Sequence, residues 1–113
     1  MFSLFKRGSP IASTTSIDVM AKRKDGVLEL LIVPAGSLDS SPATQKLLLD
    51  KIETYLSFLQ SEECSSEFGE LEASQKLIAV IAYRKPDSVL SQTLEAAGKW
   101  VADSGATFEV RLG

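Results

Sequence analysis

The chain has no histidine and only one cysteine among its 113 residues. Histidine is the usual proton donor and acceptor near neutral pH and the commonest metal ligand. Its absence excludes nucleophiles that a histidine activates and most transition-metal sites. The single Cys64 lies among glutamates, which disfavour its thiolate, so we expect a structural cysteine rather than a nucleophile. We therefore expect neither an enzyme nor a bound metal or cofactor.

A strong charge of one sign and long apolar runs are also lacking. Twelve basic and 15 acidic residues give a net charge of −3, and no basic stripe is present that would coat phosphates. No window approaches the apolar length of a membrane span, and the apolar residues at the N-terminus precede the charges, the reverse of a secretory signal. A lone cysteine forms no internal disulfide, which is typical of a reducing compartment. These features predict a cytoplasmic protein without a membrane span that does not bind nucleic acid.

The length and the 44% hydrophobic content suffice for one core without disulfides or metal. We expect a disordered segment over residues 1–16, rich in serine and threonine towards its end, and a single domain over residues 17–113.

The first part of that domain is predicted to be a β-hairpin over residues 17–33 that turns at Asp25-Gly26. If these two residues alone form the loop, Lys22 lies opposite Glu29, and their opposite charges favour that register. The same register places one set of alternate residues on the core face: Ile17, Val19, Ala21, Leu28, Leu30 and Ile32.

Four further segments complete the predicted fold. Ser41-Pro42 is typical of a helix start, and the following apolar spacing predicts a helix over residues 43–61. After an acidic connection, residues 77–83 are apolar at every position, which is typical of a central strand. A second helix over residues 88–104 and a strand over residues 106–112 follow. The order ββαβαβ predicts a two-layer α/β (α+β) sandwich, a four-stranded sheet with two helices on one face.

These elements resemble those of an uncharacterised family of small bacterial proteins, a domain of unknown function. The residues that carry the resemblance are the Ile17-Asp18 strand, the Asp25-Gly26 turn, the Leu28/Leu30/Ile32 strand, the helix Leu47-Leu48…Lys51-Ile52…Tyr55-Leu56, and the closing Gly105…Phe108-Glu109-Val110. The resemblance implies the same element order and a bacterial, intracellular setting. It implies no catalytic or binding residues.

The sheet face that the two helices leave uncovered is the main functional feature of the predicted fold. In the register above it carries Met20, Val27, Leu31 and Val33 with part of the central strand, surrounded by charged residues. An apolar centre with a charged rim is typical of a protein interface, unless the N-terminal segment or a helix covers it. We therefore predict a non-catalytic protein-interaction domain that self-associates through this face as a homo-oligomer, or binds another protein there.

The strand-to-helix loops offer an alternative. If both helices start at the same edge of the sheet, Ser37 and Ser40 of one loop lie beside Arg84 and Lys85 of the other. Helix starts of this kind bind anions through backbone N–H groups. This arrangement would make the chain a small-molecule or anion-binding regulatory domain, although helix capping and solvation also explain these residues.

Overall fold

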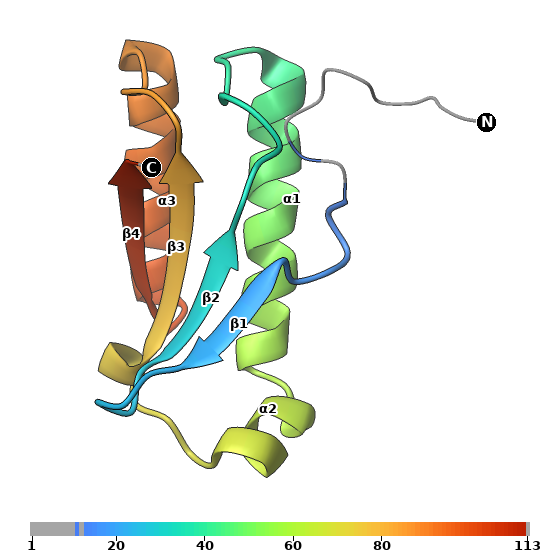
Figure 1. The fold of residues 1–113 in the computed structure, drawn as a ribbon, viewed down its shortest axis with the longest axis vertical. Helices are drawn as coiled ribbons and strands as arrows, with labels where there is room; N and C mark the ends of the chain where they lie inside the picture. Colours follow the sequence, from blue (N-terminus) through green and yellow to red (C-terminus); the bar gives the residue numbers. More distant parts are fainter. Residues whose placement is uncertain (1–10, 12, 113) are drawn as a thin grey trace, which may run out of the picture.

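A four-stranded sheet and two long helices form the framework of the chain (Figure 1). The computed structural model describes residue 11 and residues 13–112. Its elements are β1 (Val19–Lys22), β2 (Leu28–Ile32), α1 (Pro42–Leu59), α2 (Glu62–Phe68), the 3-10 turn η1 (Ala73–Gln75), β3 (Lys76–Ala82), α3 (Ser88–Asp103) and β4 (Thr107–Leu112). The predicted fold class is confirmed, and the order ββαβαβ is extended by α2 and η1, which lie in the predicted acidic connection.

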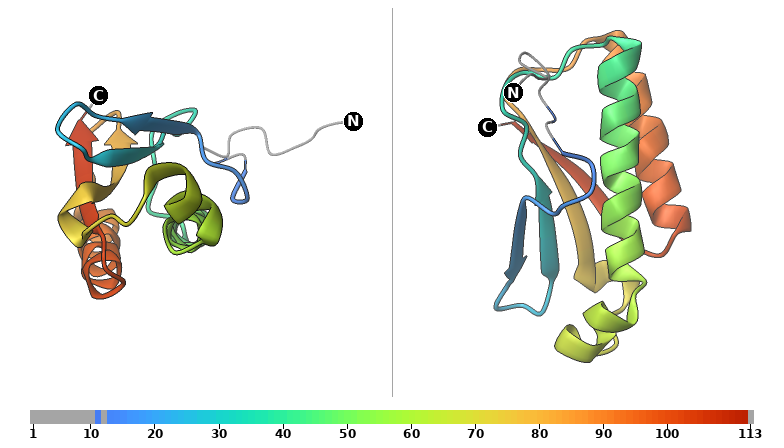
Figure 2. Two further views of the ribbon diagram at one scale, coloured as in Figure 1. Left: turned by 90° about the horizontal axis from the view of Figure 1, so that it is seen from below. Right: turned by 90° about the vertical axis from the view of Figure 1, so that its right-hand side faces the viewer.

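The strands lie in the order β1-β2-β3-β4. β1 runs antiparallel to β2, whereas β2, β3 and β4 are mutually parallel, so α1 and α3 each belong to a crossover between parallel strands. Both long helices lie on the same side of the sheet, and α2 extends beyond the end of α1 (Figure 2). The opposite face carries no helix among the described residues.

Capping residues set the helix ends close to the predicted positions. Ser41 accepts a hydrogen bond from the Thr44 backbone N–H at 3.2 Å, and Asp87 does the same for Leu90 at 2.8 Å. Helix α3 ends with Gly105 at φ +87°, the left-handed conformation expected after a helix. No helix in the described part of the chain is long and apolar enough to cross a membrane.

The core fills the space between the sheet and the two long helices. The apolar residues at helical spacing are buried: Leu48, Ile52, Tyr55, Leu56 and Leu59 on α1, and Leu90, Leu94, Ala97 and Val101 on α3. They pack against alternate residues of the central strands: Leu28, Leu30, Ile32, Ile78 and Val80. Each such aliphatic side chain contributes about 1.5–3 kcal/mol by its burial.

The hairpin register differs from the prediction by one residue. Arg23 N–H donates to the Val27 carbonyl at 2.8 Å and Gly26 N–H to the Arg23 carbonyl at 3.1 Å, so the loop has three residues rather than two. Gly26 has φ +91°, as the last position of such a loop requires. Lys22 consequently pairs with Leu28, and the predicted Lys22–Glu29 pairing is wrong. Because side chains alternate along a strand, this shift exchanges the two faces of β1.

The packed part of the chain begins before residue 17. Ile11 is buried in the core cluster. The Ser13 carbonyl accepts a hydrogen bond from Lys51 Nζ at 2.7 Å, and the Thr14 carbonyl accepts one from the Thr54 hydroxyl. Ile11, Ser13 and Thr14 therefore contact the packed domain ahead of the predicted boundary at residue 17. The prediction of disorder for residues 1–10 and 12 lies outside the described residues.

Candidate interaction surface

The uncovered sheet face carries an apolar patch near the carboxyl ends of β2 and β3. Its members are Val19, Leu31, Val33, Ile81 and Tyr83, which we call the apolar patch. Val19 pairs with Leu31 across β1 and β2, and Leu31 is opposite Ala79 of β3. Val19, Val33 and Tyr83 are exposed, and Leu31 and Ile81 are half-buried.

Two of the four predicted interface residues therefore lie in this patch and two do not. Leu31 and Val33 are on the uncovered face, as predicted. Met20 pairs with Leu30, whose side chain is in the core, so the register shift places Met20 on the helix side of the sheet. Val19, which pairs with Leu31, lies on the uncovered face instead. Val27 is half-buried beside the hairpin loop, at the other end of β2.

A cluster of charged side chains occupies the rest of the uncovered face. Arg111 of β4 donates to Glu29 of β2 at 2.7 Å, and Arg23 donates to the same Glu29 oxygen at 3.2 Å. Arg111 also donates to Glu109. We call Arg23, Glu29, Glu109 and Arg111 the charge cluster. The hydrogen bond from Arg111 holds the pKa of the Glu29 carboxyl below its usual value, and the same carboxylates raise the pKa of Arg111.

The charge cluster covers the middle of the sheet. Arg111 reaches from β4 to β2, so its side chain crosses β3. Leu77 and Ala79 of β3 are on this face, yet they are only 5% and 0% exposed. The uncovered face therefore has a closed, charged half and an open, apolar half.

A second group of polar side chains lies where α1 meets the start of the hairpin, with Lys51 and Tyr55 buried and Asp18 partly exposed. Lys51 Nζ donates to Asp18 Oδ1 at 2.7 Å, and Asp18 Oδ2 accepts the Val33 N–H at 2.9 Å. The Tyr55 hydroxyl donates to the Leu31 carbonyl at 2.7 Å and accepts the Asp18 N–H at 2.9 Å. Burial raises the pKa of the Tyr55 hydroxyl.

No sequence pattern indicated that Lys51, Asp18 and the Tyr55 hydroxyl would come together. Each buried side-chain polar atom in the described part of the chain has a partner. The group joins α1 to both hairpin strands, and its contacts within the chain favour a structural role.

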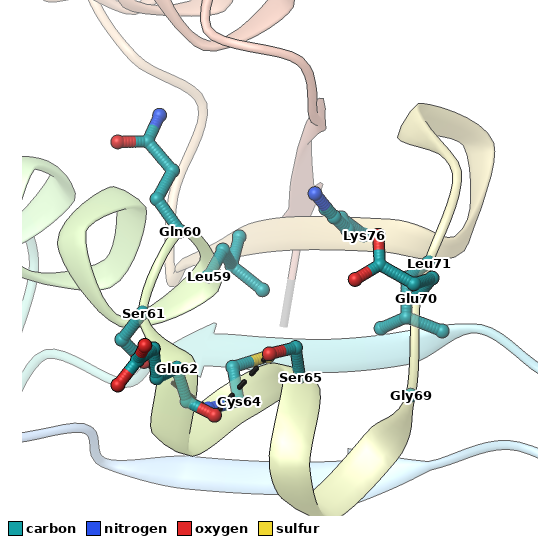
Figure 3. A pocket seen from close by; sticks show the side chains of 10 residues that line it. All are labelled: Leu59, Gln60, Ser61, Glu62, Cys64, Ser65, Gly69, Glu70, Leu71 and Lys76. Atoms are coloured by element: carbon teal, nitrogen blue, oxygen red, sulfur yellow. Dashed lines mark hydrogen bonds between the residues drawn. The ribbon is translucent and has the colours of Figure 1, made fainter.

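Cys64 lies in a small hollow of about 210 Å³ between the end of α1, α2 and the start of β3 (Figure 3). Its backbone N–H donates to Ser61 Oγ at 3.1 Å, the cap of α2. The side chain is 2% exposed, and burial raises the pKa of the thiol. A buried thiol of this kind is a poor nucleophile. Among the described residues no group of histidine, cysteine, aspartate and glutamate side chains could hold a metal ion.

A larger groove of about 660 Å³ runs between α3 and β4. Leu94 and Gly98 of α3 line one side of it, and Phe108, Val110 and Leu112 of β4 line the other. Leu112 is 68% exposed, the most exposed of the large apolar side chains described. This groove adjoins the free edge of the sheet and had no counterpart in the sequence analysis.

The predicted anion-binding residues lie at one end of the sheet, and neither of the two hollows described above brings them together. α1 and α3 both begin at that end (Figure 2), and the Thr93 hydroxyl of α3 donates to Gln45 Oε1 of α1 at 2.7 Å. Ser37, Arg84 and Lys85 are exposed and Ser40 is half-buried. Neither of the two hollows above includes Ser37, Ser40 or Arg84, and Lys85 lines the groove beside α3 instead.

The architecture defines a small two-layer α/β domain. A family model matches residues 9–113, and the chain belongs to that family, a family of unknown function (DUF6572). The match confirms the resemblance to a domain of unknown function, and its start at residue 9 agrees with a packed chain that begins before residue 17. No curated protein and no solved structure matches the chain.

Proposed function

We propose that this chain is a non-catalytic protein-interaction domain that works through the uncovered face of its sheet. The observation that carries the proposal is the apolar patch on a sheet whose parallel strands are covered on one side only. All-parallel sheets occur almost only with both faces covered, and three of the four strands here are parallel. A protein surface that docks on Leu31 and its neighbours would supply the second cover.

The two halves of the face have different roles in this proposal. The apolar half, centred on Leu31, provides the area that a partner buries. The charge cluster lies beside it with its bonds already formed inside the chain, so it sets the orientation of the partner more than the affinity. A second copy of the chain is the partner that the sequence predicts, and another protein remains the alternative.

The setting proposed for this interaction is the cytoplasm, and the partner proposed is a protein rather than a nucleic acid. The net charge of −3 disfavours contact with phosphates. The single cysteine is reduced and buried, as is common for proteins of a reducing compartment.

The test is the solution mass of the wild type and of Leu31→Asp, measured by light scattering over a wide range of concentrations. A carboxylate at the centre of the apolar patch would prevent its burial against a partner. We expect the wild type to form an oligomer that Leu31→Asp weakens.

A matched control is Val89→Asp, which places the same charge at an exposed position on α3, away from the sheet face. Both variants should keep the circular dichroism spectrum of the wild type. If Leu31→Asp keeps the mass of the wild-type oligomer, the uncovered face is not the surface of self-association. A wild type that is monomeric at every concentration refutes self-association altogether.

A further inference from the structure

The two edge strands of the sheet, β1 and β4, differ in how well they are protected against pairing with a strand of another chain. β1 is short, with four residues, and ends in Lys22. β4 has six residues, contains no proline or lysine, and pairs with β3 alone among the described strands. The backbone groups on its outer side therefore have no strand partner. Natural sheets usually protect such an edge, because it is a template for another chain.

The groove beside this edge also lacks a cover. Its apolar walls come from α3 and from the helix-side residues of β4, and Leu112 stands open to solvent there. A strand added at the edge would carry a helix or side chains over the same groove. The edge and the groove therefore form one surface, which combines backbone hydrogen bonding with apolar burial.

The sequence of β4 is complementary to itself in one antiparallel register. When Val110 lies opposite Val110 of a second copy, Glu109 lies opposite Arg111, and Phe108 lies opposite Leu112, each of these twice. The charged pairs fall on the uncovered face and the apolar pairs on the helix side, so both faces match.

The neighbouring registers are unfavourable. A register centred on Glu109 brings two glutamates together, and one centred on Arg111 brings two arginines together. A shift by a single residue would set uncovered-face side chains against helix-side side chains. Of these registers, the one centred on Val110 pairs opposite charges and matches the faces.

We infer that β4 is the contact through which two copies of this chain join, edge to edge and antiparallel, into one continuous eight-stranded sheet. The two α3 helices then lie on the same side of that sheet, and the two grooves close against each other. Glu109 and Arg111 keep enough exposure, 44% and 32% of their side chains, to bond across the junction as well as within the chain. This inference goes beyond the proposed function, since it uses the edge and leaves the apolar patch free in the dimer.

The test uses two full-length variants that each carry like charges on β4. Glu109→Arg places arginine opposite arginine in a homodimer, and Arg111→Glu places glutamate opposite glutamate. In a mixture of the two, every arginine of one chain faces a glutamate of the other. Two cross-strand pairs change from attraction to repulsion in each homodimer, so we expect about tenfold weaker association. Equimolar mixing should restore association, measured by light scattering with one variant labelled.

The control for the charge change is Glu53→Arg, on the exposed side of α1. Because Arg111 also bonds Glu29 within the chain, thermal unfolding of each variant must first show a folded protein. If Arg111→Glu does not fold, Leu112→Asp replaces it, and its association is compared with that of the wild type. Leu112→Asp places a charge in the groove and leaves the charge cluster intact.

The outcomes separate this inference from the proposed function. Weakened association in the single variants with recovery in the mixture supports edge pairing. Unchanged association in both variants, or no recovery on mixing two folded variants, overturns it, whatever the effect of Leu31→Asp. A change with Leu31→Asp alone assigns self-association to the uncovered face.

Discussion

The ion pair between the buried Lys51 and the partly exposed Asp18 predicts an unequal response to the loss of either partner. The Lys51 side chain is 2% exposed, whereas the Asp18 side chain is 27% exposed. Among the described residues, Lys51 Nζ donates hydrogen bonds to Asp18 Oδ1 and to the Ser13 carbonyl, at 2.7 Å each. Removing Asp18 thus leaves a cation nearly without water, and removing Lys51 leaves an anion that water can still reach.

We therefore expect Asp18→Asn to destabilise the fold more than Lys51→Met. Asp18→Asn keeps an oxygen for the Val33 N–H but leaves the ammonium group of Lys51 without a counter-charge, at a cost of about 3–5 kcal/mol. Lys51→Met keeps the apolar stem and loses two hydrogen bonds, one of them to a carboxylate that remains partly solvated. Its cost is about 2 kcal/mol.

Urea unfolding, followed by the fluorescence of Trp100 and by circular dichroism, gives the two free energies. The double variant should cost less than the sum of the single variants, because no charge is then left unpaired. Equal costs, or a larger cost for Lys51→Met, would show that the burial of the ammonium group is not the dominant effect. If each single variant lowers the free energy of unfolding by less than about 1 kcal/mol, the ion pair does not stabilise the fold.

Four other expectations follow from single contacts. Tyr55→Phe removes two buried hydrogen bonds and should lower the free energy of unfolding by about 2 kcal/mol in the same urea titration; an unchanged midpoint would contradict this. Because the pKa of Glu29 lies below its ordinary value of 4.5, its stabilisation is present at neutral pH and is lost as the pH falls through the folded-state pKa. Glu29→Gln should accordingly lose less thermal stability on acidification than the wild type, and equal losses would refute the assignment. Cys64 should react with a thiol reagent far more slowly in the folded chain than in urea, since burial hides the thiol and raises its pKa; equal rates would show an open site. If the anion-binding alternative holds, phosphate or sulfate raises the melting temperature of the wild type and not that of Arg84→Ala with Lys85→Ala, whereas no effect of either ion refutes it.

The order and approximate bounds of the long helices and of the central strand could be predicted, because local sequence signals mark each of them. The Ser41-Pro42 start and the Asp87 cap are local signals, and the structure places the helix ends beside them. The apolar run of β3 indicated a central strand, and β3 lies between β2 and β4. Helix α2 was missed because its seven residues include three glutamates and two serines and bury only Cys64. A segment so polar has no periodic pattern to detect.

The candidate surface was predicted only in part, because half of it depends on contacts between distant segments. Leu31 and Val33 follow from alternation along β2. Arg111 and Glu29 are 82 positions apart, and their contact exists only once the parallel order β2-β3-β4 is formed. The burial of Ala79 beneath Arg111 could not be predicted from β3 itself, whose run is apolar on both faces.

The hairpin shows how a single residue in a loop decides which surface a strand presents. The two-residue loop was favoured because it pairs Lys22 with Glu29. In the structure Arg23 takes that role, bonding both Glu29 and Asp25, so the charge pair no longer requires the shorter loop. Lys22 is freed to turn towards the helix side, where its ammonium group lies 5.7 Å from the centre of the Phe68 ring of α2. The register of β1 and the presence of α2 are therefore linked, and a prediction that lacks the helix has no reason to choose the longer loop.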